Sequence, residues 1–482
     1  MVRRVLPLLL LVLACRTAEI PRRPALPARL PTRILPRDAE ISPRFRELAG
    51  PDGRAWLRLL VDLREQPDFA PILALEATGG IPRSAFREFT LRELRTLSRR
   101  GTEEVRPLLE ELEAQGLVDW WQPVRYMNRI HVVAKLAALP RLAAHPAVAR
   151  LVPEVDSVRD ARRHAGGFLR KADPVPPGPS WGVEVLGLPA LWEEGVDGRG
   201  VVIGSLDSGV MGDHEAFRDA RAEGSSWFDP VGGRPDPVDT VPHGSEVLAC
   251  ALGRPVRGHA LGAAPGARWV AALANQYNSY NNVNMALAAD WMLFDTQRLD
   301  VVLGAWGHGK GSCDDRDLPM VEAFLAAGVL PVFAAGNDGP EPGSCQAPAN
   351  LPLPAGGGPL AVAAIDRHLH VIEPSSRGPS PCGRTGVFPD VAAPGFKLPV
   401  PAPPTPRSLG LASGTSHATG WVGGVAALVF QVAPELTPLQ VMEILRETAR
   451  DLPPEGPDPA SGYGLVDPAA AVARAREMAG RH

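Results

Sequence analysis

The sequence predicts an α/β protein with a doubly wound, mostly parallel sheet, preceded by a small α+β domain. Two observations predict this fold class. Beyond residue 180, short and continuously apolar runs alternate with stretches of helical periodicity, as in a parallel sheet whose faces are covered by helices. Before residue 160, strand and helix patterns follow a different order. A chain of 482 residues exceeds one average core, so two domains, or one large domain with appendages, are expected.

The first fifteen residues indicate export. Two arginines precede an apolar run over residues 5–13, which is too short to cross a bilayer as a helix. The run ends in VLAC, which resembles a bacterial lipobox whose cysteine is lipidated; an ordinary signal peptide is the alternative. We therefore expect a signal peptide ending at Cys15, a lipid anchor on that cysteine, and a place in the bacterial cell envelope or outside the cell.

Residues 16–179 divide into three parts. Residues 16–54 are rich in Pro and Arg, can bury little, and are expected to form a tether. Residues 55–160 indicate a small α+β unit, and residues 161–179 an exposed linker rich in Gly, Pro and Arg. Within the α+β unit we expect strands at 56–63, 129–136 and 148–155 and helices at 84–116 and 136–148.

The remaining chain, residues 180–475, is expected to form the large domain. Its ligand site should lie at the carboxyl ends of the strands, as in other open α/β sheets. Thr437, Pro438 and Gln440 have the types that an N-cap, a first helical residue and a capping-box partner require. The five expected strands are 201–206, 268–273, 300–304, 330–336 and 360–365, and helices are expected at 282–294, 320–328 and 438–450.

Charge and cysteine usage exclude some functions. The net charge is −4, so nothing indicates a nucleic-acid partner. Export permits disulfides, and besides Cys15 the chain holds four cysteines, which allow three pairings. There is no CxxC motif, so these cysteines do not predict a metal site. The four are Cys250, Cys313, Cys345 and Cys382.

Four polar residues lie at the ends of separate elements. Asp207 follows a predicted buried strand, His243 precedes an apolar helix, Asn337 follows another strand, and Ser416 begins a helix in SGTSHATG. A serine nucleophile needs a base to take its proton, and that base needs a third group to fix its tautomer. An amide can donate to a developing oxyanion. Each residue alone could be a cap, turn or core residue, but the combination favours nucleophilic catalysis.

Chain order and motifs carry a family resemblance. The order Asp, His, Ser excludes the α/β-hydrolase arrangement, whose histidine follows the serine. Eight segments of the chain resemble the motifs of subtilisin-like serine proteases (subtilases). The segments around the four polar residues are VVIGSLDSGVMGDHEAF, HGSEVLACALG, AAGN and SGTSHA, and the others are GAAPGARWVAAL, SSRGPSP, PDVAAPG and GYGLVDPAAA. The resemblance covers residues 180–470 and predicts a subtilisin-like fold for this part.

The resemblance implies a role for each motif residue. Ser416 would be the nucleophile, His243 the general base and acid, and Asp207 the orienting carboxylate. Asn337 and the Ser416 backbone N–H would bind the oxyanion. Two segments should hold the substrate backbone as an added strand and shape the first specificity pocket. Their residues are Gly304, Ala305, Trp306, Gly307, Ala334, Ala335 and Gly336.

The family also implies partners. Proteins or peptides would be the substrates, and residues 55–160 would be a propeptide that assists folding and inhibits the enzyme until cleavage in 161–179. No cofactor is required for the chemistry; structural calcium is common in the family, but no acidic ligand loop is evident. Because Cys313 and Cys345 lie in the loops after the two pocket walls, the expected disulfide joins them.

Some positions depart from the family pattern. His417 stands where the family has methionine, Gly420 where it has proline, and Ala305 where serine is frequent. None removes a member of the triad. We expect His417 to pack in its helix, because adjacent helical residues point to different sides. Two rival functions remain open: a binding module that keeps the fold without turnover, and a processing protease for one partner protein.

Overall fold

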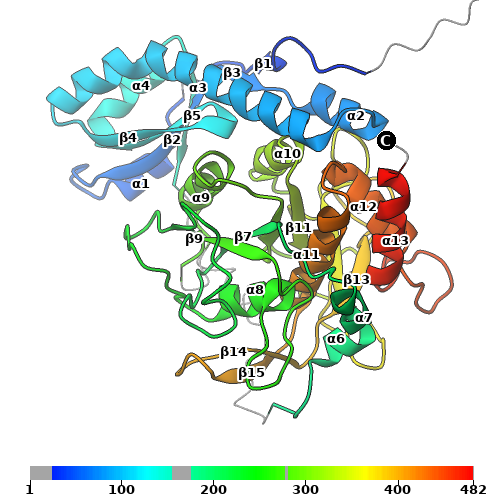
Figure 1. Cartoon of the computed structure of the whole chain (residues 1–482). Coiled ribbons are helices and arrows are strands. Elements are labelled where there is room, and N and C mark those ends of the chain that lie inside the picture. The colour runs from blue at the N-terminus through cyan, green and yellow to red at the C-terminus, as the bar shows by residue number, and fades with distance from the viewer. Residues whose placement is uncertain (1–23, 39, 155–174, 277–279, 481–482) are drawn as a thin grey trace, which may run out of the picture.

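The structure is a computed structural model that describes residues 24–38, 40–154, 175–276 and 280–480 (Figure 1). The predicted export signal, the lipid anchor at Cys15 and residues 155–174, which include most of the predicted linker, lie outside the described residues. Two units are visible in Figure 1: an N-terminal unit, coloured blue to cyan, and a larger unit, coloured green to red.

A seven-stranded parallel sheet forms the centre of the larger unit, which confirms the predicted fold class. The strand order is β13-β12-β11-β10-β7-β9-β8, and each neighbouring pair runs parallel. Five of these strands were predicted, and their residues are almost all buried, as the continuous apolar runs require. The strands are β7 (Val202–Asp207), β8 (Trp227–Phe228), β9 (Arg268–Leu273), β10 (Val301–Gly304), β11 (Leu330–Ala334), β12 (Leu360–Ile365) and β13 (Val391–Pro394).

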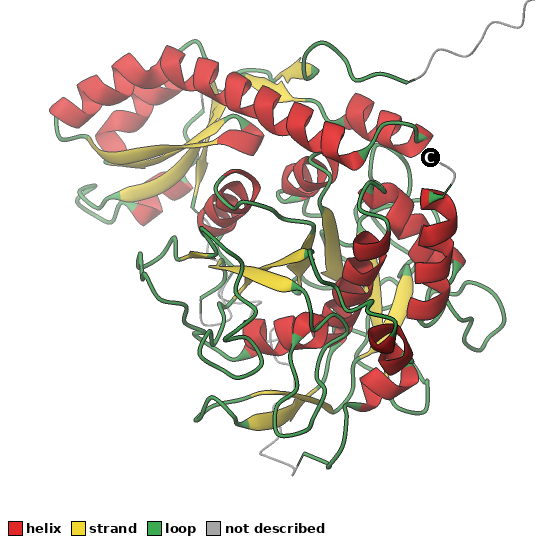
Figure 2. Ribbon diagram, in the orientation of Figure 1, coloured by secondary structure: helices red, strands yellow, loops and turns green. Residues whose placement is uncertain are grey.

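Helices cover both faces of this sheet (Figures 1 and 2). Helices α8 (His243–Leu252) and α11 (Thr415–Val432) pack against each other, and α11 lies along β10 to β13. Helices α9 (Asn282–Phe294) and α10 (Leu318–Ala326) contact the sheet on the side that faces the N-terminal unit. The remaining elements are α6 (Trp181–Val185), α7 (Leu188–Glu193), α12 (Pro438–Glu447), α13 (Pro468–Ala479) and the hairpin β14 (Leu398–Pro401)–β15 (Leu409–Ala412).

The predicted capping box of α12 is confirmed. The Thr437 hydroxyl accepts from the Gln440 N–H, and the Gln440 side chain accepts from the Thr437 N–H. Two otherwise unpaired backbone donors are satisfied in this way, which fixes where the helix begins.

The N-terminal unit is a four-stranded antiparallel sheet with the order β4-β5-β2-β6, covered by a 32-residue helix, α3. The sequence predicted this helix and three of the strands, but not β4, whose outward residues are polar or partly exposed. The elements are β1 (Thr32–Ile34), α1 (Arg44–Leu48), β2 (Leu57–Leu63), β3 (Glu65–Pro67), α2 (Ala70–Thr78), α3 (Arg83–Ala114), β4 (Val118–Val124), η1 (Arg125–Met127), β5 (Arg129–Ala134), η2 (Leu136–Ala138), α4 (Leu139–Ala144) and β6 (Val148–Pro153).

The segment 16–54 is not wholly a tether. Helix α1 lies within it, and Phe45 and Ala49 are fully buried in the hydrophobic core of the N-terminal unit. The composition of the segment concealed this helix, because only a few apolar residues among many Pro and Arg anchor it.

The junction between the two units combines apolar packing with charged pairs, since Phe69, Ile72 and Phe86 of the N-terminal unit belong to the same hydrophobic core as the larger unit. The Arg83 guanidinium on α3 donates to the buried Asp300 carboxylate at 2.8 Å, and Arg87 lies 3.7 Å from the same carboxylate. On η1, Arg125 pairs with Asp290 at 2.9 Å and with Asp295 at 2.6 Å. In each pair the N-terminal unit supplies the cation and the larger unit the anion.

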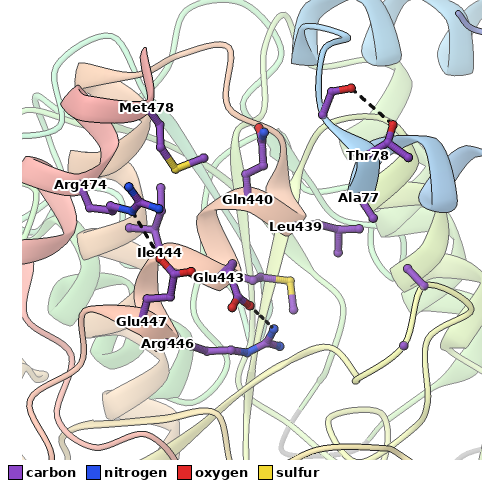
Figure 3. A pocket seen from close by; sticks show the side chains of 14 residues that line it. Ala77, Thr78, Leu439, Gln440, Glu443, Ile444, Arg446, Glu447, Arg474 and Met478 are labelled. Atoms are coloured by element: carbon purple, nitrogen blue, oxygen red, sulfur yellow. Dashed lines mark hydrogen bonds and ion pairs between the residues drawn. The ribbon is translucent and has the colours of Figure 1, made fainter. Parts of the chain in front are cut away.

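A cavity of about 440 Å³ marks the same junction near α2, α12 and α13 (Figure 3). Its charged side chains pair with one another: Arg446 lies 3.5 Å from Glu443, and Arg474 lies 3.3 Å from Glu447. The cavity is therefore a gap between packed helices. It is separate from the predicted site, which lies at the carboxyl ends of the strands.

Candidate active site

The site begins with Asp207 and His243. Asp207 is the last residue of β7, and His243 is the first residue of α8. The Nδ1 atom of His243 lies 2.8 Å from Oδ1 of Asp207, and both side chains are buried. Because a carboxylate accepts this bond, Nδ1 carries the proton and Nε2 is left with a lone pair. The structure thus brings together the two residues that the sequence had placed 36 positions apart.

The environment of His243 favours its protonated form. Burial lowers the pKa of the imidazole, but the Asp207 carboxylate outweighs burial through its charge and its hydrogen bond. Glu246 and Asp239 add smaller contributions in the same direction, and the pKa rises to about 9. A base with this pKa is fully available for proton transfer only in alkaline solution.

Asp239 was not singled out in the sequence, yet it positions the start of α8. Its carboxylate accepts from the N–H and the hydroxyl of Ser245 at 2.9 and 2.6 Å, and from the Ser208 hydroxyl at 2.7 Å. Ser208 in turn accepts from the N–H of Gly244 at 2.9 Å. This network ties the residues beside Asp207 to those beside His243. The residues of this network come from three segments of the chain. No sequence motif contains all three, so no signal in the sequence identified Asp239.

Ser416 lies in the first turn of α11, directly after Gly414 and Thr415. Gly414 has φ +145°, a conformation that side-chain-bearing residues rarely adopt, so a glycine is needed for the turn that presents Ser416. The Ser416 hydroxyl lies 3.4 Å from the carbonyl oxygen of Ala305. A change of the Ser416 rotamer would turn the hydroxyl away from Ala305 and towards another partner. Hydrogen bonds between catalytic groups often become short only when substrate is bound.

The orientation of Asn337 follows from its neighbours. The N–H of Thr415 lies 3.0 Å from Oδ1 of Asn337, and the Thr415 hydroxyl also lies 3.0 Å from that atom. A backbone N–H can only donate, so the facing atom must be the amide oxygen. The NH₂ group of Asn337 therefore points away from Thr415 and is available as a donor beside the start of α11.

The two predicted substrate-binding segments lie side by side. Strands β10 and β11 are parallel neighbours, with Gly304 opposite Phe333, so the residues after each strand meet at one edge of the sheet. Ala305 also contacts Ser416, as described above. The segments are Gly304, Ala305, Trp306 and Gly307 after β10, and Ala334, Ala335 and Gly336 at the end of β11.

Trp306 lies in an aromatic cluster. Its ring centroid is 5.6 Å from that of Phe333 and 5.7 Å from those of Tyr280 and His308. The Tyr280 hydroxyl donates to Asp317, which also pairs with His308. The side chain is only partly exposed, so it forms a fixed wall of this edge.

The structure explains two departures from the family pattern. His417 is fully buried, as expected, and its Nε2 lies 3.1 Å from Oε2 of Glu246 on α8. Gly420 lies where α11 approaches α8 most closely: a Cβ atom at this position would be 2.3 Å from the carbonyl oxygen of Val247. Any larger residue, proline included, would force the helices apart, so the glycine is required by this helix contact.

The predicted disulfide is wrong. Cys313 bonds with Cys382, not with Cys345, and their Cα atoms are 5.3 Å apart. The loops of Cys313 and Cys345 are indeed adjacent, since the N–H of Gly311 donates to the carbonyl of Cys345. The chain segment around Cys382, however, folds back onto the same place, and Cys345 is a buried free thiol. Sequence position could not reveal this third segment.

Within the described ranges, no group of three or more His, Cys, Asp or Glu side chains could hold a metal ion. In the same ranges, none of the helices is both long enough and apolar enough to cross a bilayer.

Comparison with known proteins gives the family. The model of the subtilase family matches residues 198–464, which is more than half of the chain and includes all four candidate residues. The chain belongs to the subtilase family. The match begins just before β7 and ends after α12, so it covers the parallel sheet and leaves out the N-terminal unit.

Three relatives illustrate the range of this subtilase's similarity. Bacillopeptidase F of Bacillus subtilis (strain 168) is 28% identical over 82% of this chain and 29% of its own length. Subtilisin-like protease SBT6.1 of Arabidopsis thaliana is 31% identical over 59% of this chain and 27% of its own length. Subtilisin Savinase of Lederbergia lenta is 30% identical over 61% of this chain and 98% of its own length. The chain thus spans less than a third of the first two.

Proposed function

We propose that this subtilase is a serine endopeptidase that cuts peptide bonds through an acyl-enzyme on Ser416 and is made as a self-processing proenzyme. The observation that carries the proposal is the buried Asp207–His243 hydrogen bond of 2.8 Å at the edge of the sheet where Ser416 and Asn337 also lie. Family membership supports the reaction class.

In the first half of the reaction, Ser416 attacks the carbonyl carbon of the scissile bond while Nε2 of His243 takes the hydroxyl proton. Asp207 holds the imidazole in the required tautomer and stabilises the imidazolium that forms. The negative charge on the substrate oxygen is met by the Asn337 NH₂ group and the Ser416 N–H at the start of α11. The tetrahedral intermediate then collapses, and His243 gives its proton to the leaving amine.

In the second half, water replaces the amine. His243 removes a proton from the water as it attacks the acyl carbon, and the same oxyanion donors stabilise the second tetrahedral intermediate. Ser416 leaves with the proton from His243, and the carboxylic acid product is released. No cofactor takes part in these steps.

Substrates are proposed to be proteins or peptides bound along 304–307 and 334–336 as an added strand. The N-terminal unit is proposed to be the propeptide, held on the larger unit by the Arg–Asp pairs described above and cleaved in 161–179. Export, with a lipid anchor on Cys15, is proposed from residues 1–15 alone. Loss of metabolic lipid labelling in Cys15→Ser would support the anchor; unchanged labelling would reject it.

The central experiment compares wild type with Ser416→Ala, both expressed without residues 1–15. Intact mass and N-terminal sequencing should show that wild type loses its first ~160–180 residues while the variant stays full length. Labelling by a fluorophosphonate, which requires an activated serine, should occur in wild type only. If wild type stays intact and unlabelled, the binding-module alternative replaces this proposal. Hydrolysis of casein by wild type would argue against a protease restricted to one partner.

A further inference from the structure

A second carboxylate–imidazole pair lies directly beside Asp207 and His243. It consists of Glu246 on α8 and His417 on α11, with Nε2 of His417 3.1 Å from Oε2 of Glu246. Both side chains are buried, 0% exposed for His417 and 3% for Glu246. The proposed mechanism gives neither residue a chemical step, and burying two ionisable groups in a helix–helix contact is costly unless they pair.

The hydrogen-bond partners of the pair indicate its charge. Nδ1 of His417 is buried and has no partner in the described residues, and the same holds for Oε1 of Glu246. A doubly protonated imidazole would leave a buried N–H without an acceptor, which is unfavourable. The neutral imidazole can instead donate its Nε2 proton to the Glu246 carboxylate. The pair then carries one negative charge, located on Glu246 and held there by His417.

This charge lies close to the catalytic base. Glu246 follows His243 by three residues in the first turn of α8, so the two share one side of the helix. The rings of His243 and His417 meet edge to face with centroids 6.4 Å apart. A buried carboxylate at this range interacts with an imidazolium far more strongly than an exposed one does, because little water lies between them to screen it.

We propose that Glu246 and His417 are positioning residues for the catalytic base: His417 holds the Glu246 carboxylate in place, and Glu246 supplies a second negative charge that sets the pH range in which His243 can act. This inference rests on the proposed function of His243. The other ionisable groups that face the pair are Asp207 at the end of β7, Asp239 before α8, and the Cys250 thiol one turn further along α8.

The direction of the effect follows from charge alone. A general base must be unprotonated, so activity rises as pH increases through the pKa of His243, which is about 9 with Glu246 in place. Removing the negative charge destabilises the imidazolium and lowers this pKa. The acid limb of the pH–rate profile should then move to lower pH, so the variant is relatively more active in neutral solution.

Three variants isolate the effect. Glu246→Gln keeps the size and the acceptor but removes the charge. His417→Leu removes the donor that holds the Glu246 carboxylate near His243, so this variant should shift the limb in the same direction. His417→Gln keeps a donor and should leave the limb near its wild-type position. Glu443→Gln, a partly exposed carboxylate on α12, is the matched control and should leave it unchanged.

The first measurement is the pH dependence of fluorophosphonate labelling of the whole chain. In Glu246→Gln the midpoint should fall by about one pH unit, which is about tenfold in relative rate at pH values below both midpoints. The double variant Glu246→Gln/His417→Leu should shift no further than either single variant, since both act through the same carboxylate.

A second measurement does not depend on turnover. In the Ser416→Ala chain, the ¹³Cε1 resonance of His243, assigned by its loss in His243→Gln, should titrate at lower pH when Glu246→Gln is added. An unchanged midpoint in both measurements would overturn the inference and leave the pair a packing feature. If the resonance shifts but wild type is never labelled, the electrostatic inference holds and the proposed function fails.

Discussion

The two units of this subtilase differ in what holds them together. The sheet of the larger unit is covered by helices, and its strands and α11 are almost entirely buried and apolar. The N-terminal unit has its own apolar core, and it attaches to the larger unit through shared apolar packing, in which Phe86 takes part, together with ion pairs such as Arg83–Asp300 and Arg125–Asp290. Apolar packing responds little to salt or pH, whereas charged pairs respond to both. The ion pairs of the junction are therefore the part of the attachment that a change of pH can weaken.

The largest expected effect concerns the oxyanion donor of the catalytic unit. Asn337→Ala should lower kcat by roughly 10²–10³-fold with little change in KM, because the lost donor acts on charge that develops only in the transition state. Because self-cleavage uses the same oxyanion donor, cleavage of the N-terminal fragment should slow as well. Steady-state kinetics on a peptide substrate would test this, and a rise in KM at constant kcat would contradict the assigned role. Thr415→Val, which removes one hydroxyl donor to Asn337, is the control and should cost far less.

The next effect concerns packing within the catalytic unit. Gly420→Ala places a Cβ atom 2.3 Å from the Val247 carbonyl oxygen, so α8 and α11 must separate. Overpacking of this kind costs about 1–3 kcal/mol of unfolding free energy. Thermal unfolding should show this loss of stability. Gly480→Ala is the control: its Cβ atom would lie 3.4 Å from the nearest atom, so its stability should stay at the wild-type value. Equal stability of the two variants would show that the helix contact is looser than described.

The junction between the units should be weakened by Arg83→Ala. This change removes a buried partner of Asp300, but Arg298 remains 2.8 Å from that carboxylate, so we expect a loss of about 2 kcal/mol, below the usual range for breaking a buried pair. The N-terminal fragment should leave the self-cleaved enzyme faster, as followed by size-exclusion chromatography. Arg92→Ala, at a half-exposed ion pair, is the control. After the fragment has left, turnover of a small substrate should equal that of wild type.

The effect that is smallest for a change of one pH unit is a pH dependence of the same junction. Glu76 on α2 accepts from the N–H of Leu439 at 2.9 Å, and burial raises its pKa from 4.5 to about 8. A carboxyl whose pKa is raised by docking stabilises the docked state most below pH 4.5, and this stabilisation is lost as pH rises towards 8. Retention of the fragment should fall by at most tenfold per pH unit across this window. Glu76→Gln, which keeps the acceptor, should flatten the profile; an unaltered profile would assign the dependence to other groups.

Much of the fold could be predicted because it depends on local pattern. The continuous apolar runs identified five strands of the sheet, and Thr437 with Gln440 identified the start of α12. Strand β4 was missed because its alternation is obscured by polar and exposed residues, and α1 because a single buried aromatic, Phe45, anchors it within a Pro/Arg-rich segment. Both depend on contacts with residues far along the chain, which a local window does not contain.

The candidate site, like the fold, has features that local sequence predicts and features that depend on long-range contacts. By itself the sequence determined which side chains could do chemistry, because Asp207, His243, Asn337 and Ser416 each follow or begin an element that local pattern defines. Only the tertiary structure decided which groups surround them. Glu246 pairs with His417, which lies 171 positions away, and Cys313 bonds Cys382 because a third segment folds back beside it. Electrostatic interactions and disulfides depend on distance in space, and distance in space is what the order of residues does not give.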